Sequence, residues 1–375
     1  MDGLEITKTM FGRIYKDKKV LVTGNTGFKG SWLTIWLLKL GAKVYGISKD
    51  IPTEPSMFKE LGLKNRINYR EKDVRDLESV KQIIAEVKPD FVFHLAAQPL
   101  VSVSYSDPIE TITTNVLGTS NVLEAIKESN HNCVGIIITS DKCYKNVEWV
   151  WGYKETDALG GEDIYSGSKG AAEIIFNSYY HSFFNKDESN VKLATARAGN
   201  VVGGGDWAKD RIVPDYMRAW NNNKIVEIRS PEATRPWQHV LEPLSGYLTL
   251  GRQLYGGKNL NGESFNFGPL SQYSYTVEKL LQDLSKYWNF QDRSKPYRIT
   301  NKINFHEAGL LKLNCDKALF HLKWLPTLGY EELIEFTGSW YYNFYKGRRN
   351  MIDFTLSQIE DYEQIAANKE IQWTK

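Results

Sequence analysis

Residues 18–30 read Lys-Lys-Val-Leu-Val-Thr-Gly-Asn-Thr-Gly-Phe-Lys-Gly. The apolar part of this stretch predicts a short buried strand, and three glycines follow it at a spacing of three. Apolar residues then recur at helical spacing as far as Leu40, and residues 42–47 predict a second strand. A strand, a glycine turn, a helix and another strand form the arrangement that binds dinucleotides. The sequence therefore predicts an α/β fold, a Rossmann-type doubly wound parallel sheet.

Each glycine of this loop has its own expected task. Gly24 permits the tight turn, Gly27 lets the backbone approach a pyrophosphate at the helix N-terminus, and Gly30 allows the helix to pack closely. We predict that this loop contacts the cofactor through Gly24, Thr26, Gly27, Phe28, Lys29 and Gly30.

The end of the second predicted strand decides which dinucleotide is bound. Asp50 could accept a hydrogen bond from a ribose 2′-hydroxyl, which favours NAD, whereas Lys49 could pair with the 2′-phosphate of NADP. Both remain open, and we favour NAD.

Later strands add further cofactor candidates. Strands are predicted at 67–72 and 89–98, with helices at 77–87 and 108–129. Asp73 follows the first of these strands and could contact adenine, or could simply cap the next helix. His94 within an apolar strand is interpreted as a core residue. The remaining cofactor candidates are Ser48, Asp50, Asp73, Val74, Leu95, Ala96, Ala97 and Asn115.

A predicted fifth strand, 134–139, leads to the candidate catalytic residues at the carboxyl edge of the sheet. Tyr165 and Lys169 are four residues apart and so share one face of a helix. An ammonium stabilises a phenolate, which can take a proton from a sugar hydroxyl while a hydride leaves the same carbon. Ser140 would hold that hydroxyl. A chance pair on an exposed helix is the alternative.

Asp141 and Lys142 suggest a second chemical step. An enzyme that expels water needs one group to protonate the departing oxygen and another to remove a proton from the neighbouring carbon. Residues alternate in a strand, so Asp141 would face away from Ser140 and Lys142 unless the strand ends and bends here. The alternative is a solvated pair in a loop.

The chain is long enough for a second lobe. We predict a NAD-binding domain at 1–199, to which 238–262 return, and a smaller mixed α/β substrate lobe at 200–237 and 263–375. Arginines there suit a diphosphate because a guanidinium binds phosphate in a fork, although surface ion pairs are the alternative. The substrate candidates are Gln98, Asn200, Trp207, Arg211, Arg229 and Arg235.

Composition excludes several classes of partner. The net charge of +2 gives no reason to expect nucleic acid or an anionic membrane. The three cysteines fit neither a metal site nor a disulfide framework, so no metal and a cytoplasmic location are expected. The first residues are polar and predict neither a signal peptide nor a membrane helix.

Several segments together resemble the extended short-chain dehydrogenase/reductase superfamily of NAD-dependent epimerases and dehydratases, and within it the CDP-glucose 4,6-dehydratases. The resemblance is close from about Val20 to Gly251. It rests on residues 23–32, 52–56, 94–99, 140–144, 149–153, 196–201, 203–207 and 234–239.

The resemblance implies that NAD oxidises CDP-D-glucose at C4, that water leaves from C5 and C6, and that the hydride returns to C6. The product would be CDP-4-dehydro-6-deoxy-D-glucose, a precursor of 3,6-dideoxyhexoses in surface polysaccharide. Tyr165 would be the oxidation base, Ser140 the hydroxyl holder and Asp141 the acid. Lys169 would be the partner of Tyr165 and a ligand of the cofactor ribose, so that both residues lie against the cofactor. Lys142 takes the C5-base position, where related dehydratases carry Glu.

The resemblance also implies a homodimer, possibly a tetramer, formed through two long helices at 108–129 and 165–184. Three alternatives remain: a dehydratase of another sugar nucleotide such as a GDP-heptose or GDP-mannose, a 4-epimerase, and a non-catalytic NAD sensor. An epimerase has no use for Asp141 and Lys142, and a sensor has none for Tyr165.

Overall fold

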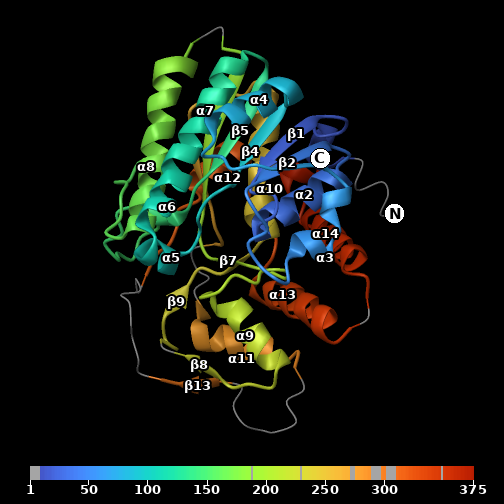
Figure 1. The fold of residues 1–375 in the computed structure, drawn as a ribbon. Helices are drawn as coiled ribbons and strands as arrows, with labels where there is room; N and C mark the ends of the chain where they lie inside the picture. Colours follow the sequence, from blue (N-terminus) through green and yellow to red (C-terminus); the bar gives the residue numbers. More distant parts are fainter. Residues whose placement is uncertain are drawn as a thin grey trace.

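The computed structural model describes residues 9–375, apart from 187–188, 229, 271–274, 289–296, 301–309 and 348. The larger part of the chain is built around one sheet, and a smaller group of elements lies beyond one end of its strands (Figure 1).

The main sheet has seven strands, and all its pairings are parallel. Its order is β11-β6-β5-β4-β1-β2-β3, so the direction of winding reverses between β1 and β4. In open α/β sheets such a reversal opens a crevice at the carboxyl ends of the strands. The prediction of a doubly wound parallel sheet is confirmed. The strands are β1 Lys19–Thr23, β2 Lys43–Ser48, β3 Asn68–Glu71, β4 Phe91–His94, β5 Cys133–Ile138, β6 Val191–Ala198 and β11 Ser264–Phe267.

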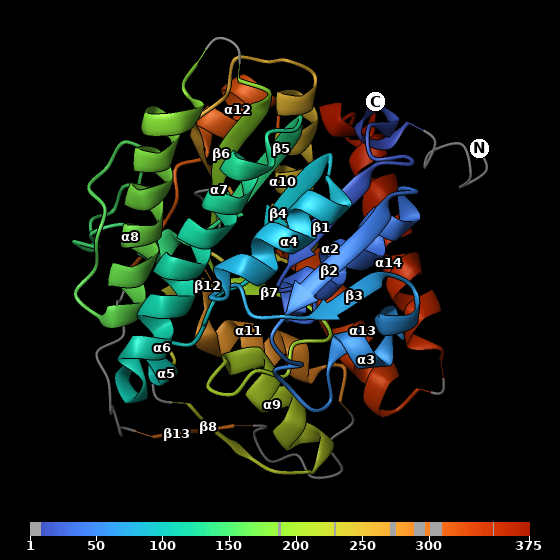
Figure 2. The same ribbon diagram turned by 45° about the horizontal axis from the view of Figure 1, so that its top comes forward.

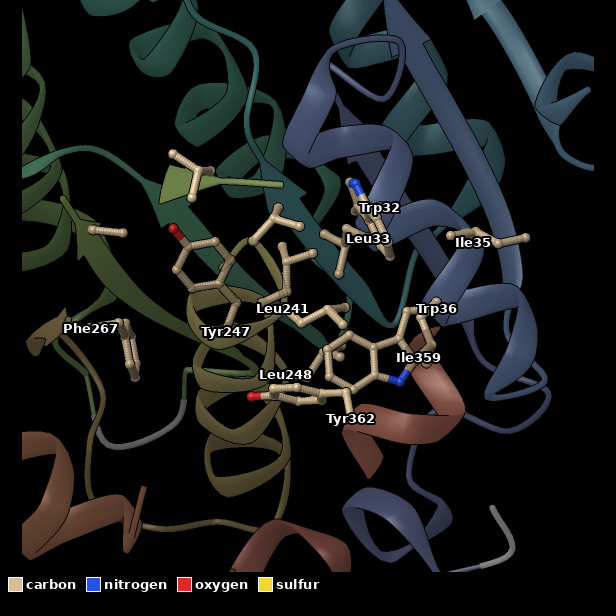
Figure 3. Packing of buried hydrophobic residues seen from close by; sticks show 14 of the residues in the cluster. Trp32, Leu33, Ile35, Trp36, Leu241, Tyr247, Leu248, Phe267, Ile359 and Tyr362 are labelled. Atoms are coloured by element: carbon tan, nitrogen blue, oxygen red, sulfur yellow. The ribbon is translucent and has the colours of Figure 1, made fainter. Parts of the chain in front are cut away.

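Helices cover both faces of the sheet, because its central strands carry near-continuous runs of buried residues and so have two faces to cover. One face packs on α4 (Leu77–Val87), α7 (Gly118–Ser129) and α8 (Ile164–Tyr179); α4 and α7 lie in front of the sheet in Figure 2. The other packs on α2 (Phe28–Lys39) and α10 (Leu241–Tyr255). Figure 3 shows side chains of α2 and α10 meeting those of α14 (Met351–Asn368) in one continuous core.

The long helix predicted at 108–129 is present but interrupted. It consists of α6 (Pro108–Ile112), a π-helical turn at Thr113–Leu117, and α7. The short α5 (Val101–Ser106) precedes it, and α8 likewise ends in a π-helical turn, Tyr180–Phe184.

The smaller lobe is mixed α/β. It contains α9 (Ile212–Asn221), α11 (Val277–Ser285), α13 (Tyr330–Tyr345) and short strand pairs. The pairs join β8 (Val226–Ile228) to β13 (Tyr297–Ile299), β9 (Thr234–Arg235) to β12 (Tyr275–Thr276), and β7 (Val201–Val202) to β10 (Gln238–His239). The other short elements are α3 (Met57–Glu60), α12 (Asp316–Leu322) and 3-10 turns at Met10–Arg13, Leu63–Asn65 and Gln372–Thr374.

The prediction that all of 263–375 belongs to the smaller lobe differs from the structure at both ends of this segment, which pack against the larger part of the chain. Strand β11 pairs with β6 and extends the main sheet. Helix α14 packs on α2, where Glu363 accepts hydrogen bonds from Trp36 (2.8 Å) and Lys39 (2.7 Å). The pattern of single segments does not reveal such long-range contacts.

Glu242, on α10, binds the segment that follows α12. Its buried carboxylate accepts hydrogen bonds from the backbone N–H groups of Thr327 (2.8 Å) and Leu328 (2.6 Å) and from the Tyr362 hydroxyl. Burial raises the pKa of Glu242 to about 7, although these donors oppose the shift.

Because the folded protein holds this proton more tightly, Glu242 stabilises the fold fully below its ordinary pKa, and the contribution is lost as pH rises to about 7. Over this pH range the free energy of unfolding falls by about 3 kcal/mol as Glu242 loses its proton. We expect Glu242→Gln, which stays neutral, to flatten this part of the pH dependence in urea titrations between pH 5 and 8. An unchanged slope would contradict the shift.

None of the helices in the described ranges combines the length and the apolar character that crossing a membrane requires.

Candidate active site

The glycine loop between β1 and α2 is fixed by close backbone contacts. Gly24 has a φ of +72°, and a Cβ there would lie 2.7 Å from the Ala96 nitrogen. A Cβ on Gly30 would lie 2.1 Å from the Gly24 oxygen. Neither position accepts a side chain unless the backbone moves, so the loop keeps its shape only with glycine at both.

Gly27 differs, because it is the N-cap of α2 and leaves open space. No side chain caps this described helix, and a Cβ on Gly27 would meet only the Gly24 oxygen, at 3.4 Å. The N–H groups of a first helical turn attract anions through their dipoles. The loop therefore fits a pyrophosphate.

Two predicted cofactor side chains brace this loop. Ser48 donates to the Asn25 side chain (2.9 Å), and the Thr26 hydroxyl donates to the Asp50 carbonyl (2.7 Å). The Asp50 side chain itself is 57% exposed at the end of β2. The Asp50 side chain therefore lies at the position where the sequence predicts a residue that binds the adenosine ribose.

The charges beside Asp50 form ion pairs with one another. Lys49 lies 2.6 Å from Glu110 and 4.0 Å from Asp50. Arg75 pairs with both Asp73 and Glu110. Asp73 therefore does not cap α4, since Asp76 does so by accepting from Ser79.

The catalytic candidates at the end of β5 lie on a sharp turn. The strand ends at Ile138, Ser140 is extended, and a 3-10 turn follows at Asp141–Cys143. The Ser140 hydroxyl donates to the Asp141 carboxylate (2.9 Å) and accepts from the Lys142 backbone N–H (3.2 Å). Asp141 is 4% exposed and Lys142 half-buried. The chain thus bends at the point where strand alternation required it.

Helix α8 brings Tyr165 and Lys169 into the same region, both buried. The Lys169 nitrogen lies 5.9 Å from the centre of the Tyr165 ring. Burial raises the pKa of Tyr165 to about 12, while Ser140 and Arg211 lower it and Asp141 raises it. Burial therefore outweighs the hydrogen bond from Ser140 and the charge of Arg211 in the free protein, and the role of Tyr165 as the base stays a prediction.

Positive charge gathers around these groups. Burial lowers the pKa of Lys169 to about 8, against the effect of Cys143 and Glu173. Burial, with Arg211 and Lys169, also lowers the pKa of Lys29 to about 8, and Asp141 opposes it. Lys29, predicted only as a cofactor contact, thus belongs to the same electrostatic cluster as Asp141.

Arg211 is placed by an ion pair with Asp206 (2.8 Å). It also interacts electrostatically with Tyr165. Of the predicted substrate arginines, Arg235 lies on β9 and donates to the Thr234 carbonyl (2.9 Å), and Arg229 falls outside the described residues. Asn200 is half-buried, and its carbonyl accepts from Gln238.

Several predicted contacts have structural partners instead. The Gln98 amide bonds to Thr111 and Leu100, and Asn115 bonds to the Gln98 backbone and to Ser168. Their polar atoms join the loop after β4 to α8. Trp207 is buried among aromatic rings and donates to the Tyr345 hydroxyl. Contact of these three with a ligand stays a prediction.

The segment around β4 behaves largely as expected. His94 is buried between the hydroxyls of Thr23 (2.7 Å) and Thr119 (3.1 Å), which agrees with a core role. Burial lowers its pKa to about 3. Leu95, Ala96 and Ala97 are half-buried beside the glycine loop, whereas Val74 is buried in the core.

A cleft that the sequence did not indicate opens beside the turn at residues 140–143, which we call the catalytic turn. Its lining includes Gly199, Gln238 and Lys312. A Cβ on Gly199 would lie 3.1 Å from the Asp141 carboxylate. The Gln238 amide oxygen is buried without a partner among the described residues. Gly199 and Gln238 lie in the segments 196–201 and 234–239 that carry the family resemblance, but only the fold brings them together beside Asp141.

The fold and this site are those of the sugar-nucleotide dehydratases. The family model for GDP-mannose 4,6 dehydratase matches residues 21–337, and the chain belongs to this family. The membership expected from sequence is confirmed.

Among individual proteins, the chain is 45% identical over 351 residues to the CDP-glucose 4,6-dehydratase of Salmonella typhimurium strain LT2, which covers 93% of this chain and 97% of that protein. It is 26% identical over 304 residues to a CDP-paratose 2-epimerase of Salmonella typhi, covering 73% and 86%.

Solved structures share the fold. A UDP-glucose 4-epimerase from Thermotoga maritima, solved with UDP-glucose, has a TM-score of 0.72 and 22% identity, covering 86% of this chain and 97% of that one. A dTDP-glucose 4,6-dehydratase from Streptomyces venezuelae, solved with NAD bound, has a TM-score of 0.72 and 19% identity, covering 86% and 96%.

Proposed function

We propose that this protein is an NAD-dependent dehydratase that converts CDP-D-glucose to CDP-4-dehydro-6-deoxy-D-glucose and water. The observation that carries the proposal is the buried Asp141, which touches Ser140 and interacts with Tyr165 at the carboxyl edge of the sheet. The 45% identical dehydratase that acts on CDP-glucose supports this choice of substrate.

The side chains divide the chemistry among them. Tyr165 takes the proton of the C4 hydroxyl, which Ser140 holds by a hydrogen bond. Lys142 removes the C5 proton, and Asp141 protonates the departing C6 oxygen, so that water leaves. Lys142 returns its proton to C5 when the hydride adds to C6. NAD, when bound, supplies the hydride acceptor and returns the hydride, so no net oxidation occurs. Lys169 would bind the cofactor ribose.

Charge at the end of β2 supports NAD rather than NADP. Lys49 is already paired with Glu110 and Arg75 with Asp73, and the exposed Asp50 carboxylate lies 4.0 Å from Lys49. A 2′-phosphate would have to compete with these carboxylates, whereas a 2′-hydroxyl can donate to Asp50. At the other end of the site, Arg211, Arg235 and Asn200 would hold the substrate diphosphate.

The direct test is incubation with CDP-glucose and catalytic NAD, followed by mass spectrometry of the sugar nucleotide. We expect a product lighter by one water, with no accumulation of reduced cofactor. Parallel reactions contain GDP-mannose, a GDP-heptose, dTDP-glucose and UDP-glucose. Turnover of one of these but not of CDP-glucose would reassign the substrate, and a product of unchanged mass would indicate an epimerase.

Two glycine substitutions test the cofactor loop. We expect Gly30→Ala to destabilise the fold by several kcal/mol, since its Cβ meets backbone at 2.1 Å. Gly27→Ala has room for its Cβ and should fold, but the methyl group projects where a pyrophosphate would approach. Thermal unfolding and NAD titration calorimetry separate the two effects. Unchanged NAD affinity in Gly27→Ala would contradict this site.

We further propose a homodimer, possibly a tetramer, formed through α6–α7 and α8. Large apolar side chains are exposed along these helices, which is typical of an interface. They are Ile109, Ile112, Leu117, Ile174 and Phe183. A cytoplasmic location also stays a prediction.

Ile109 is 67% exposed and Ile174 54%, so a charge at either fits a monomer but not an apolar interface. We expect Ile109→Asp/Ile174→Asp to sediment as a monomer. Ile225→Asp, at a 57% exposed position in the smaller lobe, is the matched control and should keep the wild-type mass. A dimer that survives the double substitution would place the interface elsewhere.

A further inference from the structure

A buried ion pair lies next to the catalytic turn. Glu173 follows Lys169 by one helical turn on α8, and its carboxylate lies 2.7 Å from the Arg197 guanidinium on β6. The two side chains are 1% and 3% exposed. Burying two charges has a large desolvation cost that an apolar pair of similar size avoids. A role beyond packing would explain why this core contains them.

Glu173 holds the start of the catalytic turn. Its carboxylate accepts hydrogen bonds from the hydroxyls of Thr139 and Thr195 (2.9 Å). Thr139 directly precedes Ser140, so this contact fixes the point where the chain leaves β5.

Arg197 holds the end of the same turn. It donates to the Tyr144 hydroxyl (2.7 Å) and to the Glu155 carbonyl (3.1 Å), and its guanidinium lies 5.0 Å from the centre of the Tyr144 ring. The Tyr144 hydroxyl in turn donates to Asn266 on β11 (2.8 Å). Tyr144 directly follows the 3-10 turn Asp141–Cys143.

We propose that Glu173 and Arg197 are a positioning pair, which fixes Ser140, Asp141 and Lys142 by holding Thr139 and Tyr144 on either side of them. Neither side chain touches substrate in this proposal. Its kinetic consequence rests on the proposed dehydratase function, whereas its consequence for the order of the turn does not.

The test replaces both charges together, because removing one leaves the other buried and unpaired. In Glu173→Leu/Arg197→Met we expect a folded protein whose backbone amides at residues 139–144 exchange hydrogen at least about tenfold faster than in the wild type. The kcat for CDP-glucose should fall about a hundredfold while KM changes little, because misplaced catalytic groups mainly affect the chemical step.

The matched control is Lys39→Met/Glu363→Leu, which removes a second buried ion pair, between α2 and α14. It should alter neither exchange at 139–144 nor kcat. If the first double variant does not fold, Thr139→Val removes the hydrogen bond to Glu173 but keeps the ion pair, and it should show the same local increase in exchange.

Wild-type exchange at 139–144 in the folded variant would overturn the inference, whatever its kcat, and so would an equal increase in the control. If the wild-type protein does not turn over CDP-glucose, the proposed function fails, but the exchange measurement still decides whether the pair positions the turn.

Discussion

Asp141→Asn is expected to oxidise the sugar at C4 and then stop before water is lost. Asparagine keeps the shape of the side chain and can still accept the hydrogen bond from Ser140, but it cannot donate the proton that the C6 oxygen needs. Loss of a general acid typically lowers the rate by about 10²–10⁴-fold. We therefore expect water loss to slow by about a thousandfold.

The oxidation step should survive in this variant, because Asp141 takes no part in it. Tyr165 still accepts the proton of the C4 hydroxyl, and Ser140 still holds that hydroxyl. Reduced cofactor should then accumulate, which its absorbance reports, while mass spectrometry detects the dehydrated product. Asp361→Asn, at an exposed position on α14, is the control. Water loss at the wild-type rate in Asp141→Asn would assign the acid to another group.

Tyr165→Phe is expected to block the reaction one step earlier. Phenylalanine preserves the packing of a buried ring but has no hydroxyl to accept the proton of the C4 hydroxyl. Without its base, oxidation should slow by about 10²–10⁴-fold, and no reduced cofactor should accumulate.

The contrast between the two variants orders the steps, because one accumulates reduced cofactor and the other does not. Tyr179→Phe, also on α8 but half-buried at its far end, removes a hydroxyl without touching the site and should retain wild-type turnover. Rapid reduction of NAD by Tyr165→Phe would show that a different group, such as Lys29, acts as the base.

The sequence predicted which candidate catalytic residues lie together at the end of β5 and on α8, but not their electrostatics. Tyr165 and Lys169 share a helix face because of their spacing, which needs no tertiary information. Their pKa values depend on burial, which lowers that of Lys169 to about 8 and raises that of Tyr165 to about 12. Spacing carries no information on solvent access, so these pKa shifts could not be predicted from the sequence.

Contacts between distant segments were also beyond sequence reasoning. Gln98, after β4, and Asn115, on the following helix, hydrogen-bond to each other's segments, which their positions in the sequence did not indicate. Their contact with a ligand stays a prediction. Arg197 lies in the segment 196–201 that carries the family resemblance, but nothing in the sequence indicates that Glu173 is its partner. Their pairing follows from the packing of α8 on β6.

The sequence by itself determined the glycine turn, the order of strands and helices, and the residues that end β5 and begin α8. Each of these depends on residue type at a fixed local spacing, which the chain carries wherever it folds. Only the tertiary structure decided that β11 completes the main sheet, that the turn after Ile138 buries Asp141 beside Tyr165, and that Lys29 and Arg211 meet there. These depend on burial and on contacts between segments far apart in the chain, which no local pattern encodes.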